Sequence, residues 1–161
     1  YGEKLVKDPT LLELAADAIQ AAAGRNPDDY RLRESLSDVY YFRAESVSDP
    51  NEKTAYFEQA YITLKQAWQR FPGSDRITFK LGNIAEELGL TAEAAGWYCR
   101  AVTIEQAYRR QFTEMYPEYD LFSRLGQQRL EYARKYVQEH SSLLPEKERN
   151  GRLQDPNTPI P

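Results

Sequence analysis

The sequence has very little of what most catalytic and metal sites are built from. Cys99 is the only cysteine among 161 residues, which excludes an intrachain disulfide and a cysteine-based metal site. His140 is the only histidine, so a histidine-rich metal site or a Ser/His/Asp triad has almost nothing to be assembled from. We therefore expect no catalytic residue, no metal and no cofactor in this chain, and a binding role instead of an enzymatic one.

Two further absences restrict the partner. No apolar run approaches the roughly 18 residues that cross a bilayer, so we expect no direct membrane insertion by this segment. The formal net charge of −4 comes without a basic stripe, which argues against a nucleic-acid partner. The chain begins at Tyr1 rather than methionine, which indicates a piece of a longer protein. An upstream membrane region, and the side of the membrane on which this segment lies, stay open.

The most specific pattern lies between Leu81 and Ala101. Its small and bulky residues are spaced as in a helix-turn-helix repeat: Leu81-Gly82, Gly89, Ala94, Tyr98 and Ala101. This pattern resembles the tetratricopeptide repeat (TPR) family. Gly82 and Ala94 are small where two helices must approach closely, and Tyr98 supplies bulk beside them. Gly89 suits the left-handed end of the first helix, and Thr91 is expected to cap the second.

The same reasoning divides the rest of the chain into helices. Capping residues, apolar spacing and the positions of prolines set the expected boundaries. Thr10 and Glu13 predict a capping box at the start of the first helix. The expected helices cover about residues 10–23, 29–47, 50–71, 75–88, 91–115 and 119–141.

One helical hairpin is expected to be longer than the family's repeat. Leu36 and Leu81 occupy equivalent places but lie 45 positions apart, about 11 more than a 34-residue repeat. Eleven residues make about three helical turns, so the added length keeps the buried faces in register. We predict an extended hairpin that turns at Asp49, and not a disordered insertion.

These elements predict an all-α fold. Residues 1–144 are expected to form a TPR-like helical-hairpin solenoid of about six helices, with one extended hairpin and a C-terminal capping helix. Residues 145–161 are polar and rich in proline, which predicts an irregular tail.

The TPR resemblance implies a binding groove lined by the first helix of each repeat. Projected onto this chain, the lining residues are Arg31, Glu34, Asp38, Tyr41, Arg76, Phe79, Lys80, Asn83 and Glu86. Asn83 matches an asparagine that holds an extended peptide in chaperone-binding members of the family. Glu34 and Phe79 stand where those members carry cations, which disfavours a clamp for a C-terminal carboxylate.

Aromatic residues outside this groove offer further surfaces. Trp68, Trp97, Tyr116 and Tyr119 are candidates for self-association or for docking on a parent domain, although core packing is the simpler use of both tryptophans. The run from Tyr108 to Phe112 carries Arg109 and Arg110 between its rings, which is a pattern also used for RNA stacking. Acidic neighbours on both sides argue against that use.

A second resemblance concerns the context of the chain. The run from Trp97 to Gly126 is similar to the C-terminal repeats of some bacterial O-antigen ligase-like or polymerase-like membrane proteins. Two functions follow. The first is a non-catalytic interaction or assembly module of a larger bacterial protein that binds a protein or peptide, with homo-oligomerisation left open. The alternative is an accessory domain of a glycan ligase or polymerase that contacts the glycan or a partner subunit.

Overall fold

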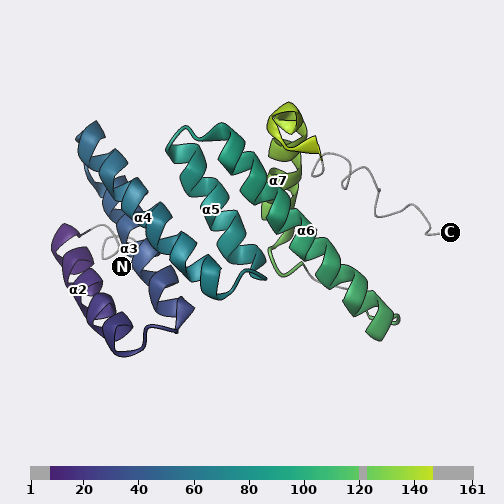
Figure 1. Cartoon of the computed structure of the whole chain (residues 1–161), viewed down its shortest axis with the longest axis horizontal. Helices are drawn as coiled ribbons and strands as arrows, with labels where there is room; N and C mark the ends of the chain where they lie inside the picture. Colours follow the sequence, from purple (N-terminus) through teal and green to yellow (C-terminus); the bar gives the residue numbers. More distant parts are fainter. Residues whose placement is uncertain (1–7, 120–122, 147–161) are drawn as a thin grey trace. The chain divides into compact units, whose positions relative to one another are not determined.

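The computed structural model describes residues 8–119 and 123–146 (Figure 1). Within these ranges the regular structure consists of six α-helices and a short 3₁₀ helix, without a strand. The all-α prediction, with its helical hairpins, is therefore confirmed. The chain divides into two compact units: residues 8–73 with Asn83–Gly89 form the first, and Ser74–Gly82 with the described residues from Leu90 onward form the second.

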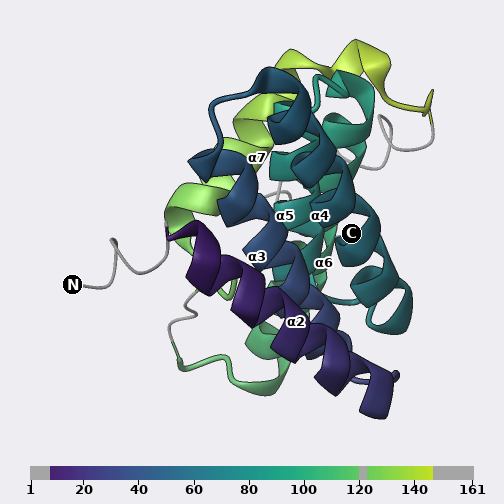
Figure 2. The ribbon, with the colours of Figure 1, turned by 90° about the vertical axis from the view of Figure 1, so that its left-hand side faces the viewer.

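The first unit is built on three helices that lie side by side (Figure 1, Figure 2): α2 (Pro9–Arg25), α3 (Tyr30–Ser46) and α4 (Pro50–Arg70). Helix α3 packs against both α2 and α4. The interface between α2 and α3 buries a small apolar cluster of Leu12, Ala16, Leu36 and Val39. Burial of such side chains is the main stabilising contribution of each helix pair.

The extended hairpin is formed by α3 and α4. Only residues 47–49 separate the two helices, so the insertion is helical, as predicted. Asp49 ends the connection, and its carboxylate accepts hydrogen bonds from the backbone amides of Asn51 at 2.7 Å and Glu52 at 3.3 Å. Buried Ser37 joins the two helices because its hydroxyl donates a hydrogen bond to the carbonyl oxygen of Ala60 at 2.8 Å.

The predicted start of the first helix was wrong. Helix α2 begins at Pro9, and Asp8 caps it by accepting hydrogen bonds from the amides of Thr10 and Leu11. An Asp-Pro pair provides a carboxylate at the cap and a pre-set backbone angle in the first turn, and this pair places the start before Thr10. The helix also continues through Gly24 to Arg25.

The second unit contains the N-terminal part of α5 (Asp75–Glu87), together with α6 (Thr91–Met115), α7 (Gln127–Glu139) and the 3₁₀ helix η1 (Ser141–Leu143). Gly82 and Ala94 are both buried, and the Tyr98 ring fills the space beside Gly82. Tyr98 also lies within 5.6 Å, centroid to centroid, of three further rings: Phe79, Tyr132 and Tyr136. Small residues and one large ring therefore fit together as the sequence predicts.

The ends of α5 and α6 agree only in part with expectation. Gly89 takes the left-handed conformation that was predicted, with φ +71°. Thr91 does not cap α6, because the helix already includes it and the cap position is Leu90. Helix α6 runs for 25 residues past Gln106 to Met115, shortly before Pro117, as predicted.

The last helix is shorter than the expected 119–141. It begins at Gln127 because Gly126 has φ +91°, a conformation outside the helical region, so Leu125 and Gly126 precede the helix. It ends at Glu139, and η1 follows. The predicted helical residue Phe122 and most of the predicted tail, residues 147–161, lie outside the described residues. Among the residues described, no helix combines the length and apolar character of a membrane span.

Candidate functional site

The groove residues of the first unit differ greatly in exposure. Arg31 is exposed and forms an ion pair at 3.0 Å with Asp29, the residue that caps α3. Asp38 and Tyr41 are half-buried, whereas Glu34 is only 5% exposed. Glu34 therefore offers almost no side-chain surface to a ligand.

Tyr41 is the predicted groove residue with a distinct electrostatic environment. Its pKa is raised, first by burial of the phenol and then by the nearby carboxylates of Glu87, Glu45 and Glu86. The structure thus brings together Tyr41 and Glu86, two of the predicted residues, within the first unit. Half-buried Asn83 belongs to the same unit.

The groove residues of the second unit include one that belongs to the core. Phe79 is 8% exposed and packs 5.3 Å from the Tyr98 ring and 6.4 Å from the Tyr132 ring, centroid to centroid. Arg76 is exposed and Lys80 is half-buried. The role of the predicted groove as a binding site stays a prediction, and Phe79 contributes packing there instead of exposed surface.

A more prominent surface lies at the C-terminal end of α6. Four aromatic rings follow one another at steps of 6.1, 5.1 and 6.3 Å between centroids, and we call them the α6 ladder: Tyr108, Phe112, Tyr116 and Tyr119. Tyr116 is 48% exposed and Tyr119 72% exposed, and Met115 beside them is 57% exposed. Contiguous exposed apolar surface of this kind marks interaction sites in soluble proteins.

The outer rings of the ladder, Tyr116 and Tyr119, are exposed because the core of the unit ends before them. Glu105 is the last buried residue of α6, and none from Gln106 to Met115 is buried. Figure 1 shows α6 continuing beyond the place where α7 crosses it. The rings at this end consequently pack on one another and not into the core.

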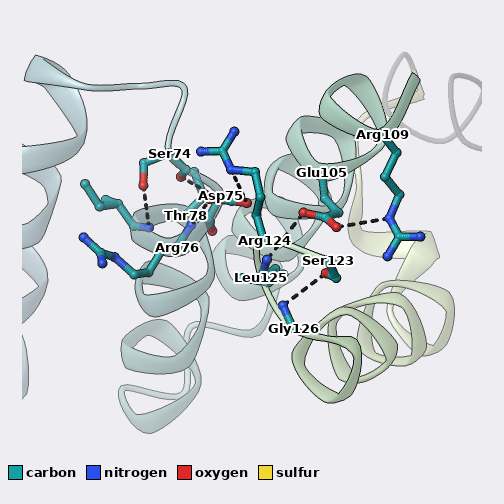
Figure 3. A network of polar contacts seen from close by, with 11 residues as sticks. Ser74, Asp75, Arg76, Thr78, Glu105, Arg109, Ser123, Arg124, Leu125 and Gly126 are labelled. Carbon is teal, nitrogen blue, oxygen red and sulfur yellow. Dashed lines mark hydrogen bonds and ion pairs between the residues drawn. The ribbon is translucent and has the colours of Figure 1, made fainter. Parts of the chain in front are cut away.

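A network of polar contacts joins α6 to the segment that leads into α7 (Figure 3). The fully buried Glu105 carboxylate accepts hydrogen bonds from Arg109 Nε at 3.1 Å and from the backbone amide of Leu125 at 3.4 Å. Buried carboxylates require such partners because desolvation penalises an unpaired charge. Through this contact α6 holds the segment that leads into α7.

A second acidic residue anchors the same segment. Asp75, which is buried at the start of α5, lies 3.8 Å (Oδ2) from Arg124 Nε. The Arg124 guanidinium in turn lies 4.7 Å from the centroid of the Tyr108 ring. The carboxylate of Asp75 therefore helps to place a cation over the first ring of the ladder.

Sequence reasoning had found the parts of this surface but not their connection. The spacing of Tyr108 and Phe112 at i and i+4 was the signal that one helix face carries both rings, and Tyr116 follows at the C-cap of the helix. The role of Glu105 could not be predicted from the sequence pattern. Its partner Leu125 lies 20 positions away and donates its backbone amide, which any residue type can do.

The other chemical candidates have packing or helix-end positions. Cys99 is buried within α6. His140 ends α7 and stacks on Tyr136 at 4.2 Å, with Nδ1 2.9 Å from the Tyr136 carbonyl oxygen. Among residues 8–119 and 123–146, no group of three or more histidine, cysteine or acidic side chains is arranged to hold a metal ion.

Comparison with known proteins adds no assignment. The chain matches no protein-family model, and it has no significant match to a curated protein.

Proposed function

We propose that this chain is a non-catalytic interaction or assembly module of a larger bacterial protein, and that the α6 ladder is its docking surface for a protein or peptide. The observation that supports this proposal most directly is the run of aromatic rings beyond Glu105, of which Tyr116 and Tyr119 are exposed. Tyrosine and methionine side chains are favoured at the centres of protein interfaces.

The architecture suits such a role. TPR-like hairpins present rigid helices as binding surfaces. The side chains of the α6 ladder lose little conformational entropy on binding, because the rings already restrict one another through their mutual packing.

A peptide-display selection on the full chain tests this proposal. Peptides that bind are synthesised, and their dissociation constants are measured by fluorescence anisotropy. Replacing two ladder rings (Phe112→Ala with Tyr116→Ser) is expected to weaken binding by about tenfold or more. Aromatic anchor residues contribute much of the binding free energy of an interface, and the replacements remove two of them.

The matched control is Ile62→Ser on α4, which removes an apolar side chain that is 59% exposed and lies outside the ladder. This variant is expected to bind the selected peptides as the original chain does. The assignment of the docking surface is contradicted if the ladder substitutions leave the dissociation constants of the selected peptides unchanged, or if both variants change them equally.

The second candidate is an accessory domain that contacts a glycan. It is favoured by the acidic residues Glu114 and Glu118, which stand on either side of the exposed Tyr116 in the sequence, with the exposed Tyr119 directly after Glu118. Sugar rings stack on aromatic faces while carboxylates accept hydrogen bonds from hydroxyl groups. Titration with soluble oligosaccharides distinguishes the two, because a glycan site requires saturable shifts of the Tyr116 and Tyr119 signals in NMR spectra without any peptide present.

A further inference from the structure

The two outer rings of the α6 ladder stand at a right angle to each other. The planes of Tyr116 and Tyr119 lie 88° apart, and their centroids are separated by 6.3 Å. Where Arg43 lies over the Tyr56 ring, its guanidinium carbon is 4.5 Å from the ring centroid. A cation at that height above each of two perpendicular faces requires centroids about 6.4 Å apart. The separation within the Tyr116–Tyr119 pair matches this requirement, so both rings can contact one cation.

The turn after α6 fixes this arrangement before any ligand binds. Tyr116 is the C-cap residue of the helix, and its amide donates a hydrogen bond to the Phe112 carbonyl oxygen at 2.8 Å. The Tyr119 amide donates to the Tyr116 carbonyl oxygen at 3.2 Å, and Pro117 between them has a restricted φ angle. The Phe112 ring packs 5.1 Å from the Tyr116 ring, centroid to centroid. A cation therefore meets two rings that lose little further freedom on binding.

Several other rings of the chain already carry a cation of their own. The cationic groups lie 4.5 to 5.5 Å from the ring centroids in these pairs: Arg43 with Tyr56, Arg124 with Tyr108, Lys65 with Tyr61, Lys53 with Phe57 and Arg100 with Trp97. Within residues 8–119 and 123–146, neither Tyr116 nor Tyr119 has a cation over its ring. Tyr116 is nevertheless 48% exposed and Tyr119 72% exposed. These two rings are therefore accessible to a cation from another molecule.

The charges around the Tyr116–Tyr119 pair favour a cation. The last turn of α6 contains no basic residue, and the carbonyl end of a helix carries a partial negative charge. From Gln111 to Ser123 the sequence contains acidic residues, Glu118 among them, but no lysine or arginine. Arg110 precedes Tyr116 by six residues, about 9 Å along the helix axis, which exceeds the Debye length of about 8 Å at physiological ionic strength. These charges attract a cationic ligand and repel an anionic one.

We infer that the Tyr116–Tyr119 pair binds a lysine side chain of the docking partner, so that the partner of the α6 ladder is a cationic protein segment. This inference rests on the proposed function, because it names the chemistry of the partner at the same surface. A lysine ammonium is compact and contacts both perpendicular faces at once, whereas the planar guanidinium of arginine stacks on one face. The apolar stem of the lysine packs along the exposed apolar surface of the ladder.

An NMR titration of the full chain tests the site with defined probes. The probes are N-acetyl-lysine methylamide, its Nε-trimethylated form and N-acetyl-norleucine methylamide, which keeps the aliphatic stem without the charge. Both charged probes are expected to shift the ring signals of Tyr116 and Tyr119 saturably. The trimethylated probe is expected to bind at least as tightly as lysine, because cation–π attraction needs no hydrogen bond. The norleucine probe is expected to give no saturable shift.

Two variants and a control separate the contributions of the ring and the charge. Tyr119→Leu keeps an apolar side chain and is expected to weaken binding of both charged probes by about two- to fivefold, the range of an exposed cation–π contact. Glu118→Gln is expected to weaken it by about twofold, and this difference should disappear at high salt. The matched control is Glu58→Gln, which removes an exposed carboxylate on α4, in the other unit of the chain. This variant is expected to leave binding unchanged.

Four results overturn the inference. These are an absence of saturable shifts with both charged probes, equal binding of the norleucine probe, unchanged binding in Tyr119→Leu, and shifts of both tyrosines with a neutral oligosaccharide but not with lysine. The last result assigns the two rings to a glycan. If the peptide selection yields no ligand, the proposed function fails while the lysine titration stands. If selected peptides depend on Phe112 and Tyr116 but the lysine probes do not bind, only the present inference fails, so the two failures are distinguishable.

Discussion

The ring of Tyr98 lies where a side chain on Gly82 would have to be. A Cβ atom added at Gly82 would be 2.6 Å from Cε1 and 2.7 Å from Cδ1 of Tyr98. Tyr98 is fully buried and is surrounded by other rings, so it cannot move aside without disturbing them. This relationship explains why a glycine stands within α5, where alanine would otherwise be the better helix former.

The first prediction follows from this contact. Gly82→Ala is expected to lower the free energy of unfolding by about 1–3 kcal/mol, because the overpacked methyl outweighs the gain in helix propensity. Urea denaturation monitored by circular dichroism measures the change. Gly96→Ala in α6 is the matched control, since a Cβ there meets nothing within 4 Å. The control is expected to stabilise the chain by about 0.5–1 kcal/mol, and equal effects at the two glycines would refute the argument.

A second prediction concerns the buried carboxylate of Glu105. Glu105→Ala is expected to destabilise the chain by about 2–4 kcal/mol, because the Leu125 amide loses its acceptor and a cavity remains. Hydrogen exchange at the Leu125 amide should accelerate at the same time. Glu114→Ala on the exposed part of α6 is expected to stay within about 0.5 kcal/mol of the original chain. Unchanged exchange at Leu125 would show that Glu105 does not hold this segment.

A third prediction concerns the cap of the extended hairpin. Asp49→Ala removes the acceptor for the Asn51 and Glu52 amides and is expected to cost about 1 kcal/mol of stability. Asp49→Asn keeps a side-chain oxygen and is expected to retain most of that contribution. Thermal unfolding of the two variants side by side checks the prediction, which is wrong if alanine and asparagine behave alike.

A fourth prediction is a dependence on alkaline pH. Burial, followed by the carboxylates of Glu87, Glu45 and Glu86, raises the pKa of Tyr41 above its ordinary value of 10.0, so folding favours the neutral phenol. The resulting stability is fully present below pH 10 and is lost as the pH rises toward the folded-state pKa, because the unfolded state ionises first. Tyr41→Phe is therefore expected to lose less stability than the original chain between pH 9 and 11. Denaturation midpoints of the two chains across this range measure the difference, and parallel curves would exclude Tyr41 as a contributor.

Helix positions followed from the sequence where local signals were strong. The α3–α4 hairpin was predictable because Asp49, Pro50 and the preserved apolar spacing all indicate one short turn between two helices. The start of α7 was not predictable in this way. It depends on the left-handed Gly126 and on the bond from the Leu125 amide to Glu105, a contact between distant parts of the sequence.

Side-chain roles were predicted less well than helix positions. Projection onto a helix face placed Phe79 in a groove, yet its ring packs in the core against Tyr98 and Tyr132. Helical spacing gives the direction of a side chain relative to its own helix, but burial depends on the exact approach of the neighbouring helix. The exposure of the outer rings of the α6 ladder could not be predicted from the sequence, because it depends on where the core ends along α6, at Glu105.

The unbroken length of α6 has a mechanical consequence. One end of this helix is gripped by the packing of Tyr98 against Gly82, and the other end carries the exposed rings. A force applied at Tyr116 is therefore transmitted along one continuous helix to the packed part of α6 around Tyr98, because the helix has no break between the two ends that could bend.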